Sequence, residues 1–160
     1  MSAQDLFRAA KARGLMIAAA ESCTGGMVSA AITDIAGSSA IFDRGFVTYT
    51  NAAKMAQLGV NEATLAAHGA VSESVAAEMA TGALAASDAD IAVSITGIAG
   101  PGGSEHKPEG RVCFGIATSA GATTETVEFG ALGRALVRAA ARDHAIGLLI
   151  AATLSIPLNT

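Results

Sequence analysis

The chain has 160 residues, enough for one domain with its own apolar core and no stabilising cross-links. Hydrophobic residues make up 51% of the sequence and charged residues 15%, which excludes an intrinsically disordered chain. The net charge is −4, and the sequence has no Trp and no run of basic residues, which argues against a nucleic-acid partner.

The cysteines and the apolar segments point to a cellular compartment. Cys23 and Cys113 are too few for a disulfide framework or a zinc site, so we expect reduced thiols and no metal. The N-terminal segment is polar and amphipathic, unlike a signal peptide. The most apolar stretch, 145–156, is shorter than the ~20 residues that span a bilayer. We therefore predict a cytoplasmic protein with no membrane partner, and the apolar composition favours a homo-oligomer.

Helices and short apolar strands alternate in the first half of the chain. Leu6, Ala9 and Ala10 recur at helical spacing, which predicts a helix over 3–13 that Gly14 ends. We expect the following elements next: a buried strand over 15–20, a turn over 21–26, a helix over 27–33, a loop over 34–40, a strand over 42–49, a helix that begins at Ala52 with Asn51 as its cap, and a helix after Asn61.

The second half begins with a helix and ends with a hairpin and a long helix. The expected elements are a helix over 73–86, a buried strand over 91–95, a glycine-rich loop over 96–104, strands over 111–118 and 123–129, and a helix over about 133–154. This order predicts an α/β protein, a single three-layer α/β/α domain over 1–160 with a mixed, mostly parallel sheet.

The turn over 21–26 contains the first candidate for chemistry, Ser22. Ligands of open α/β sheets bind beyond the carboxyl ends of strands, and this turn joins such an end to a helix. A serine there directs its hydroxyl at the site, and the backbone N–H groups of residues 24–26 could hold an oxyanion or a phosphate. The alternative is that Ser22 and Thr24 only cap the following helix.

A serine nucleophile needs a general base, and the candidates are three histidines and a lysine. His68 stands at a probable helix end, His106 in a loop and His144 inside the last helix, so no Ser-His-Asp pattern is indicated. Lys54 follows the end of a strand and becomes a base if burial lowers its pKa. The alternative for Lys54 is a solvated cation on a helix surface.

Arginines near the C-terminus are candidates for binding an anion. Arg134 and Arg138 are spaced i, i+4 on the last helix, with Arg142 one turn further. Arg134 stands in the first turn, where a cation opposes the helix dipole unless an anion is bound there. We therefore predict that Arg134 and Arg138 bind a phosphate, and the alternative is a solvated basic face.

The glycine-rich loop matches neither a Walker A motif nor a dinucleotide-binding fingerprint. Thr96, at the mouth of the preceding strand, could still orient a bound ligand. The alternative is that this loop only leads into the hairpin.

Four segments of the chain occur together in one known family. They are Ala20-Glu-Ser-Cys-Thr-Gly-Gly26, Gly45-Phe-Val-Thr-Tyr-Thr-Asn51 followed by Lys54, His68-Gly-Ala-Val-Ser72, and Ser94-Ile-Thr-Gly-Ile-Ala-Gly-Pro101. These segments closely resemble the CinA C-terminal-domain family, which includes stand-alone nicotinamide-nucleotide amidohydrolases. The resemblance extends from about residue 5 to residue 155.

The resemblance implies hydrolysis of nicotinamide mononucleotide to nicotinate mononucleotide and ammonia, a salvage step that needs no cofactor. It implies a serine–lysine mechanism in which the catalytic residues are Ser22, Lys54 and Tyr49. The oxyanion-binding and substrate-binding candidates are Cys23, Thr24, Gly25, Gly26, Thr96, Gly97 and Gly100.

The late motif of this sequence departs from the family pattern. The family reads Gly-Asp-Arg followed by Val-Arg, whereas this chain reads Leu132-Gly-Arg-Ala-Leu-Val-Arg138 and lacks the acidic residue. This difference leaves a catalytically silent nucleotide-binding or regulatory module as one alternative. An amidase that acts on another phosphorylated amide is a second.

Overall fold

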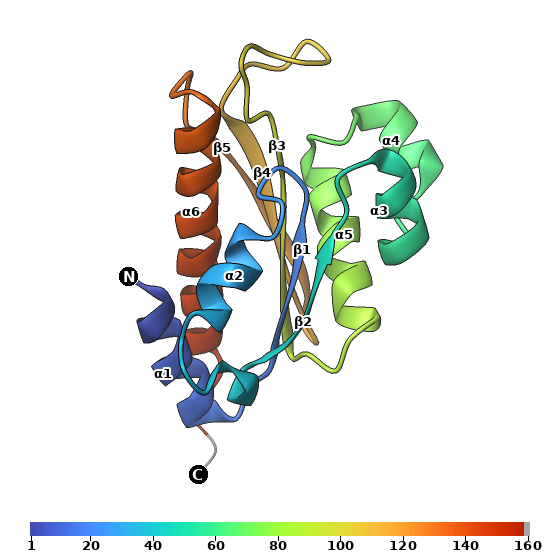
Figure 1. Cartoon of the computed structure of the whole chain (residues 1–160). Helices are drawn as coiled ribbons and strands as arrows, with labels where there is room; N and C mark the ends of the chain where they lie inside the picture. Colours follow the sequence, from blue (N-terminus) through green and yellow to red (C-terminus); the bar gives the residue numbers. More distant parts are fainter. Residues whose placement is uncertain (159–160) are drawn as a thin grey trace.

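A five-stranded sheet with helices on both faces forms the framework of the protein (Figure 1). The computed structural model describes residues 1–158. The strands are β1 (Ile17–Glu21), β2 (Phe42–Val47), β3 (Ile91–Gly97), β4 (Arg111–Thr118) and β5 (Gly121–Glu128), and their order in the sheet is β2-β1-β3-β4-β5. β1 pairs in parallel with both β2 and β3, whereas the pairs β3–β4 and β4–β5 are antiparallel.

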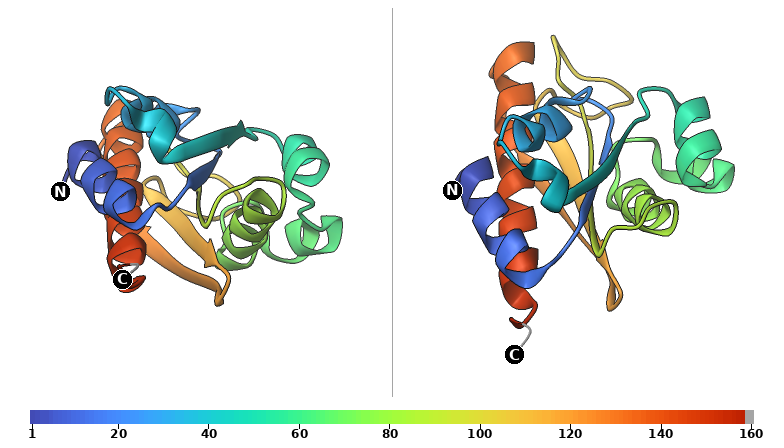
Figure 2. Two further views of the ribbon diagram at one scale, coloured as in Figure 1. Left: turned by 90° about the horizontal axis from the view of Figure 1, so that it is seen from below. Right: turned by 60° about the horizontal axis from the view of Figure 1, so that its bottom comes forward.

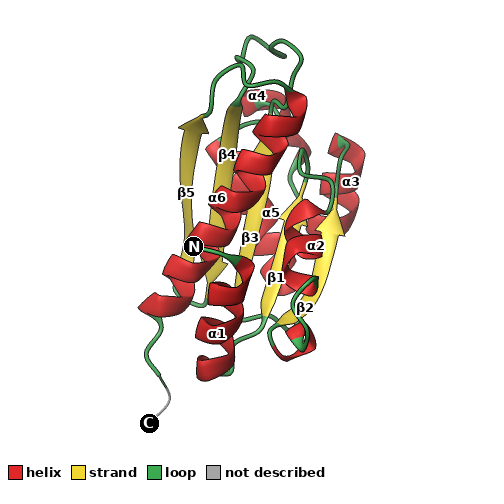
Figure 3. Ribbon diagram, turned by 60° about the vertical axis from the view of Figure 1, so that its left-hand side comes forward, coloured by secondary structure: helices red, strands yellow, loops and turns green. Residues whose placement is uncertain are grey.

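Helices cover both faces of the sheet. One face is covered by α1 (Ala3–Arg13), α2 (Met27–Thr33) and α6 (Arg134–Ser155), which lie together in Figure 3. The other face is covered by α5 (Glu73–Ala85), with α3 (Asn51–Leu58) and α4 (Glu62–His68) packed beyond it (Figure 2). The three-layer α/β/α prediction is therefore confirmed. Between residues 1 and 158, no helix is both long and apolar enough to cross a membrane.

The prediction of a mostly parallel sheet is wrong, because half of the strand pairings are antiparallel. A parallel connection needs a crossover of a dozen or more residues, usually a helix. The turn between β4 and β5 is far too short for that, and the segment between β3 and β4 contains no helix. Both connections therefore reverse the chain direction.

Smaller differences concern the ends of elements. β1 begins at Ile17 and includes Glu21, and the 34–40 segment contains a short 3-10 helix, η1 (Ser38–Ala40). Asn51 is the first residue of α3 and not its cap, because the Thr50 hydroxyl accepts the N–H of Ala53. A residue that caps must precede the helix and have an extended backbone, and Thr50 meets both conditions.

Two apolar cores, one on each face of the sheet, fix the strand ends that form the candidate site. β3 is buried along almost its whole length, with Val93 and Ile95 packed in the core beneath α6 and Ala92 in the core beneath α5. β1 lies beside it in parallel register, with Glu21 opposite Ile95. The carboxyl ends of these neighbouring strands therefore meet at one edge of the sheet.

Gly82 allows α5 to approach α3 closely, and we expect Gly82→Ala to lower the free energy of unfolding by about 2 kcal/mol. A Cβ at this position would stand 1.9 Å from the carbonyl oxygen of Leu58, so the two helices would have to separate. Gly147→Ala, in the middle of α6, is the matched control. Its Cβ would meet nothing nearer than Met1 Cε at 3.7 Å, so helix propensity predicts a gain of up to about 1 kcal/mol. Urea denaturation of both variants checks this, and equal effects would contradict it.

Candidate active site

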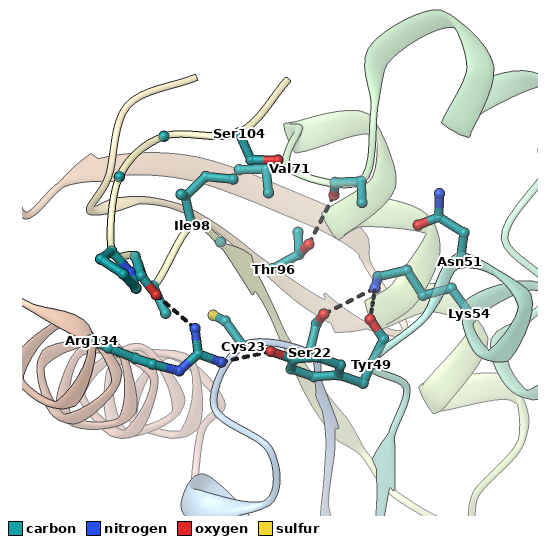
Figure 4. A pocket seen from close by; sticks show the side chains of 17 residues that line it. Ser22, Cys23, Tyr49, Asn51, Lys54, Val71, Thr96, Ile98, Ser104 and Arg134 are labelled. Carbon is teal, nitrogen blue, oxygen red and sulfur yellow. Dashed lines mark hydrogen bonds between the residues drawn. The ribbon is translucent and has the colours of Figure 1, made fainter. Parts of the chain in front are cut away.

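A cavity of about 340 Å³ opens at the carboxyl ends of β1, β2 and β3 (Figure 4). It is bounded by the turn after β1, the start of α3, the segment before α5 and the glycine-rich loop after β3. The residues that line it are Ser22, Cys23, Tyr49, Asn51, Lys54, Ala70, Val71, Thr96, Gly97, Ile98, Ala99, Gly100, Pro101, Gly102, Gly103, Ser104 and Arg134.

Lys54 and Ser22 are in direct contact in this cavity. Lys54 Nζ lies 2.9 Å from Ser22 Oγ, and it donates to the carbonyl oxygens of Thr48 at 3.1 Å and Tyr49 at 3.4 Å. The Lys54 side chain is 1% exposed, and burial lowers its pKa below the usual 10.5. None of the ion pairs found within residues 1–158 includes this lysine. The solvated-cation alternative for Lys54 is therefore wrong.

The three oxygen atoms around Nζ can be served by an ammonium group or by a neutral amine, and burial shifts the balance toward the neutral amine. A neutral Nζ has two N–H bonds, which match the two carbonyl acceptors, and one lone pair, which can accept the Ser22 hydroxyl. A serine whose proton has such an acceptor is the arrangement of an activated nucleophile.

Glu21, which the sequence analysis did not single out, fixes the turn that carries Ser22. Its buried carboxylate accepts the backbone N–H groups of Gly26, Val28 and Ser29 and the Ser29 hydroxyl, at 2.7–3.2 Å. It therefore serves as the cap of α2, whose own N-cap, Gly26, has no side chain to do so. The sequence signal for this role of Glu21 is an acidic residue five positions before a helix N-cap that is a glycine and so cannot cap with a side chain.

In the part of the chain that the structure describes, only two of the four candidate oxyanion-binding residues in the turn have a free amide. The N–H of Gly25 donates to Ser22 O, and that of Gly26 donates to Glu21, so neither is free for a ligand. Within residues 1–158, the N–H groups of Cys23 and Thr24 have no hydrogen-bond acceptor. Two consecutive unpaired amides directly after a serine are candidate oxyanion donors.

Arg134 joins two walls of the cavity mouth (Figure 4). Its guanidinium donates to Gly100 O and to the hydroxyl of Tyr49, each at 2.7 Å. Thr96 Oγ1 donates to Ala70 O at 2.8 Å and so ties β3 to the wall before α5. Tyr49, Thr96, Gly97, Gly100 and Arg134 therefore lie together, as the predicted site requires.

Arg138 and the histidines lie elsewhere. Arg138 is absent from the cavity lining, and it donates to the carbonyl oxygens of Cys23 at 3.0 Å and Thr24 at 3.3 Å. This arrangement gives no support to a phosphate-binding role. His68 and His106 do not line the cavity. His144 contacts Glu125 of the edge strand β5 and does not line the cavity either.

Cys23 lies directly after Ser22 in the turn. Its thiol is buried, and burial raises its pKa to about 11, so it stays protonated near neutral pH. Across residues 1–158, no group of three or more His, Cys, Asp or Glu side chains could hold a metal ion.

We expect Glu21→Gln to lower the free energy of unfolding by about 3 kcal/mol, because an amide NH₂ would face donors that now share a carboxylate oxygen. Glu62→Gln is the control, since Glu62 is an exposed residue in the first turn of α4, and its effect should stay within about 0.5 kcal/mol. Urea denaturation at neutral pH measures both. A Glu21→Gln protein as stable as the control would show that the carboxylate does not hold the turn.

Comparison with known proteins identifies the family. The family model described as the CinA C-terminal domain matches residues 1–153. Nicotinamide-nucleotide amidohydrolase PncC of Escherichia coli K12 is 63% identical over 119 residues, which cover 74% of this chain and 72% of that protein. The competence/damage-inducible protein CihA of Agrobacterium tumefaciens is 48% identical and has a TM-score of 0.90, with 93% of this chain and 92% of that one covered. A CinA superfamily protein of Klebsiella pneumoniae is 38% identical with a TM-score of 0.92, and 96% of each chain is covered. The chain belongs to the CinA C-terminal domain family.

Proposed function

We propose that this protein hydrolyses the carboxamide of nicotinamide mononucleotide to nicotinate mononucleotide and ammonia. The observation that carries the proposal is the buried contact between Lys54 Nζ and Ser22 Oγ at 2.9 Å, at the edge of a cavity. The name of the E. coli relative, a nicotinamide-nucleotide amidohydrolase, supplies the substrate class. A neutral lysine can accept the proton of a neighbouring serine, and the serine can then take the acyl group from an amide.

The first half of the reaction forms an acyl-enzyme. Neutral Lys54 accepts the proton of Ser22 while Oγ bonds to the carboxamide carbon. The N–H groups of Cys23 and Thr24 stabilise the resulting oxyanion, and one such donor typically contributes about 3 kcal/mol. The carbon–nitrogen bond then breaks, and the nitrogen leaves as ammonia with the proton returned by Lys54.

The second half releases the acid. A water molecule gives one proton to Lys54 and bonds to the acyl carbon, and the ester bond to Ser22 then breaks as Oγ regains a proton from Lys54. Ser22, Lys54 and the two free N–H groups supply every step of this scheme. One water molecule is consumed for each ammonia released.

The rest of the substrate occupies the cavity mouth in this proposal. Arg134 is exposed there, at the start of α6, and binds the phosphate in place of Gly100 O or the Tyr49 hydroxyl. Tyr49 has two roles: its carbonyl orients Lys54 and its hydroxyl orients Arg134. Thr96, Gly97 and Gly100 form the wall against which the nucleotide packs.

Three further properties belong to the proposal. One domain over residues 1–160 is consistent with a family match over 1–153. A cytoplasmic location is supported by the two free, buried cysteines. A homo-oligomer is supported by exposed apolar side chains near the mouth, Val47, Leu132 and Leu136.

Ser22→Ala should release no ammonia from nicotinamide mononucleotide, and Lys54→Met should lower kcat far more than it changes KM, because each removes a group of the chemical step. Ser119→Ala and Lys11→Met are matched controls at exposed positions and should behave as the unchanged protein. A coupled ammonia assay measures all five proteins. Ammonia release by Ser22→Ala would refute covalent catalysis, and none from the unchanged protein would favour a silent nucleotide-binding module.

We expect kcat/KM to rise with pH to a plateau. The active form of Lys54 is the neutral amine, so activity is lost as the pH falls through its pKa, which burial holds below 10.5. The profile of kcat/KM against pH checks this, with thermal stability followed over the same range to exclude unfolding. The Lys54→Met protein should lack this rising limb, and an identical limb in that variant would assign it to another group.

A further inference from the structure

Three arginines at one spacing on α6 have three different surroundings. Arg134 is exposed at the cavity mouth, Arg138 is half-buried against the turn that carries Ser22, and Arg142 contacts its neighbour Asp143. We propose that Arg138 is a positioning residue that aims the oxyanion donors of the turn. The inference rests on the proposed function, and it assigns Arg138 a role other than binding phosphate.

The argument begins with the peptide between Cys23 and Thr24. In a planar trans peptide, the C=O and the N–H point in opposite directions. Arg138 Nε donates to Cys23 O at 3.0 Å, so the carbonyl faces α6. The N–H of Thr24, which belongs to the same peptide, must therefore point away from α6. This N–H is one of the two that have no acceptor within residues 1–158.

The second free amide depends on the same guanidinium through one more peptide. Thr24 O accepts Arg138 Nη2 at 3.3 Å and the N–H of Met27 at 3.0 Å, which turns the N–H of Gly25 the opposite way, where it donates to Ser22 O at 3.1 Å. With Ser22 O held on that side, the N–H of Cys23 must point to the other side. Arg138 therefore orients the Thr24 N–H directly, and it orients the Cys23 N–H together with Met27 and Gly25.

Close packing and charge both favour this role. A Cβ on Gly25 would lie 3.2 Å from Arg138 Nη2, so the turn and the guanidinium are already in close contact. A hydrogen bond from a charged donor is stronger than one between neutral groups, and it polarises the peptide that accepts it. The rigid fork of arginine spans two neighbouring carbonyls, whereas a lysine ammonium is a single point donor.

Glu21 holds the other end of the same turn. Its carboxylate accepts N–H groups at Gly26, Val28 and Ser29, whereas Arg138 donates to carbonyls at Cys23 and Thr24. Glu21 therefore binds donors of the turn, and Arg138 binds acceptors. Among the N–H groups of residues 22–26, those of Cys23 and Thr24, directly after Ser22, have no acceptor within the part of the chain that the structure describes.

The test compares the three arginines of α6. We expect Arg138→Met to lower kcat by about 10²-fold, the typical effect of losing an oxyanion donor, with KM changed by less than about twofold. Arg138→Lys should fall between Arg138→Met and the unchanged protein, because it retains a charge but reaches one carbonyl. Arg134→Met should raise KM for nicotinamide mononucleotide more than it lowers kcat, and Arg142→Met should change neither.

The outcomes separate the two roles. A raised KM with unchanged kcat in Arg138→Met and Arg138→Lys would overturn the proposal and make Arg138 a phosphate ligand. Thermal melting of each variant distinguishes a loss of folding from a loss of rate, and Arg138→Lys retains the test where the methionine variant unfolds.

A crystal structure of Arg138→Met gives a readout that does not depend on activity. We expect the peptide between Cys23 and Thr24 to be rotated, and an unrotated peptide with its N–H still aimed away from α6 would overturn the proposal. If the unchanged protein released no ammonia from nicotinamide mononucleotide, the proposed function would fail, while the peptide orientation would still decide the role of Arg138.

Discussion

A lysine buried beside a serine is the constraint to which the surrounding structure responds. Lys54 has almost no contact with solvent and takes part in none of the ion pairs within the described chain, so burial disfavours its charged form. The two carbonyl groups that face it come from the chain that leaves β2, at Thr48 and Tyr49. They orient the amine without neutralising it as a carboxylate would. In the proposed mechanism, the absence of a counterion favours the neutral amine that acts as the base.

Glu21, the acidic residue directly before Ser22, does not act as that counterion. Both of its oxygens are occupied by donors at the start of α2, which also closes this helix terminus to any anionic ligand. At the start of α6, by contrast, Gly133 provides no side-chain cap and Arg134 is exposed, which is where the proposed function places the phosphate. The two helix N-termini near the cavity thus differ because one is capped by a buried carboxylate and the other has no side-chain cap.

Local pattern predicted the type and order of the helices and strands well, since periodicity and caps act within one element. It predicted the β4–β5 hairpin but not the antiparallel pairing of β3 with β4, because which strands become neighbours in the sheet is decided by tertiary packing. The pairing of Ser22 with Lys54 came from the family resemblance, since spacing alone favoured a solvated lysine. Tertiary contacts determine the roles of Glu21 and Arg138 and the hydrogen bonds of the Gly25 and Gly26 amides. The periodicity of the sequence does not predict such contacts.

The altered motif before Arg134 shows how such three-dimensional partners can compensate for a sequence change. The family pattern has an acidic residue just before this arginine, and the chain has Gly133 there. In the structure a carboxylate reaches the same helix start from the loop after β3: Glu109 accepts the N–H of Gly133 at 3.3 Å and that of Gly102 at 2.7 Å. Arg134 is in turn oriented by Gly100 O and Tyr49, neither of which belongs to its own segment. Because the arginine and the helix start are each held by other parts of the chain, the orientation of Arg134 does not depend on an acidic residue at position 133.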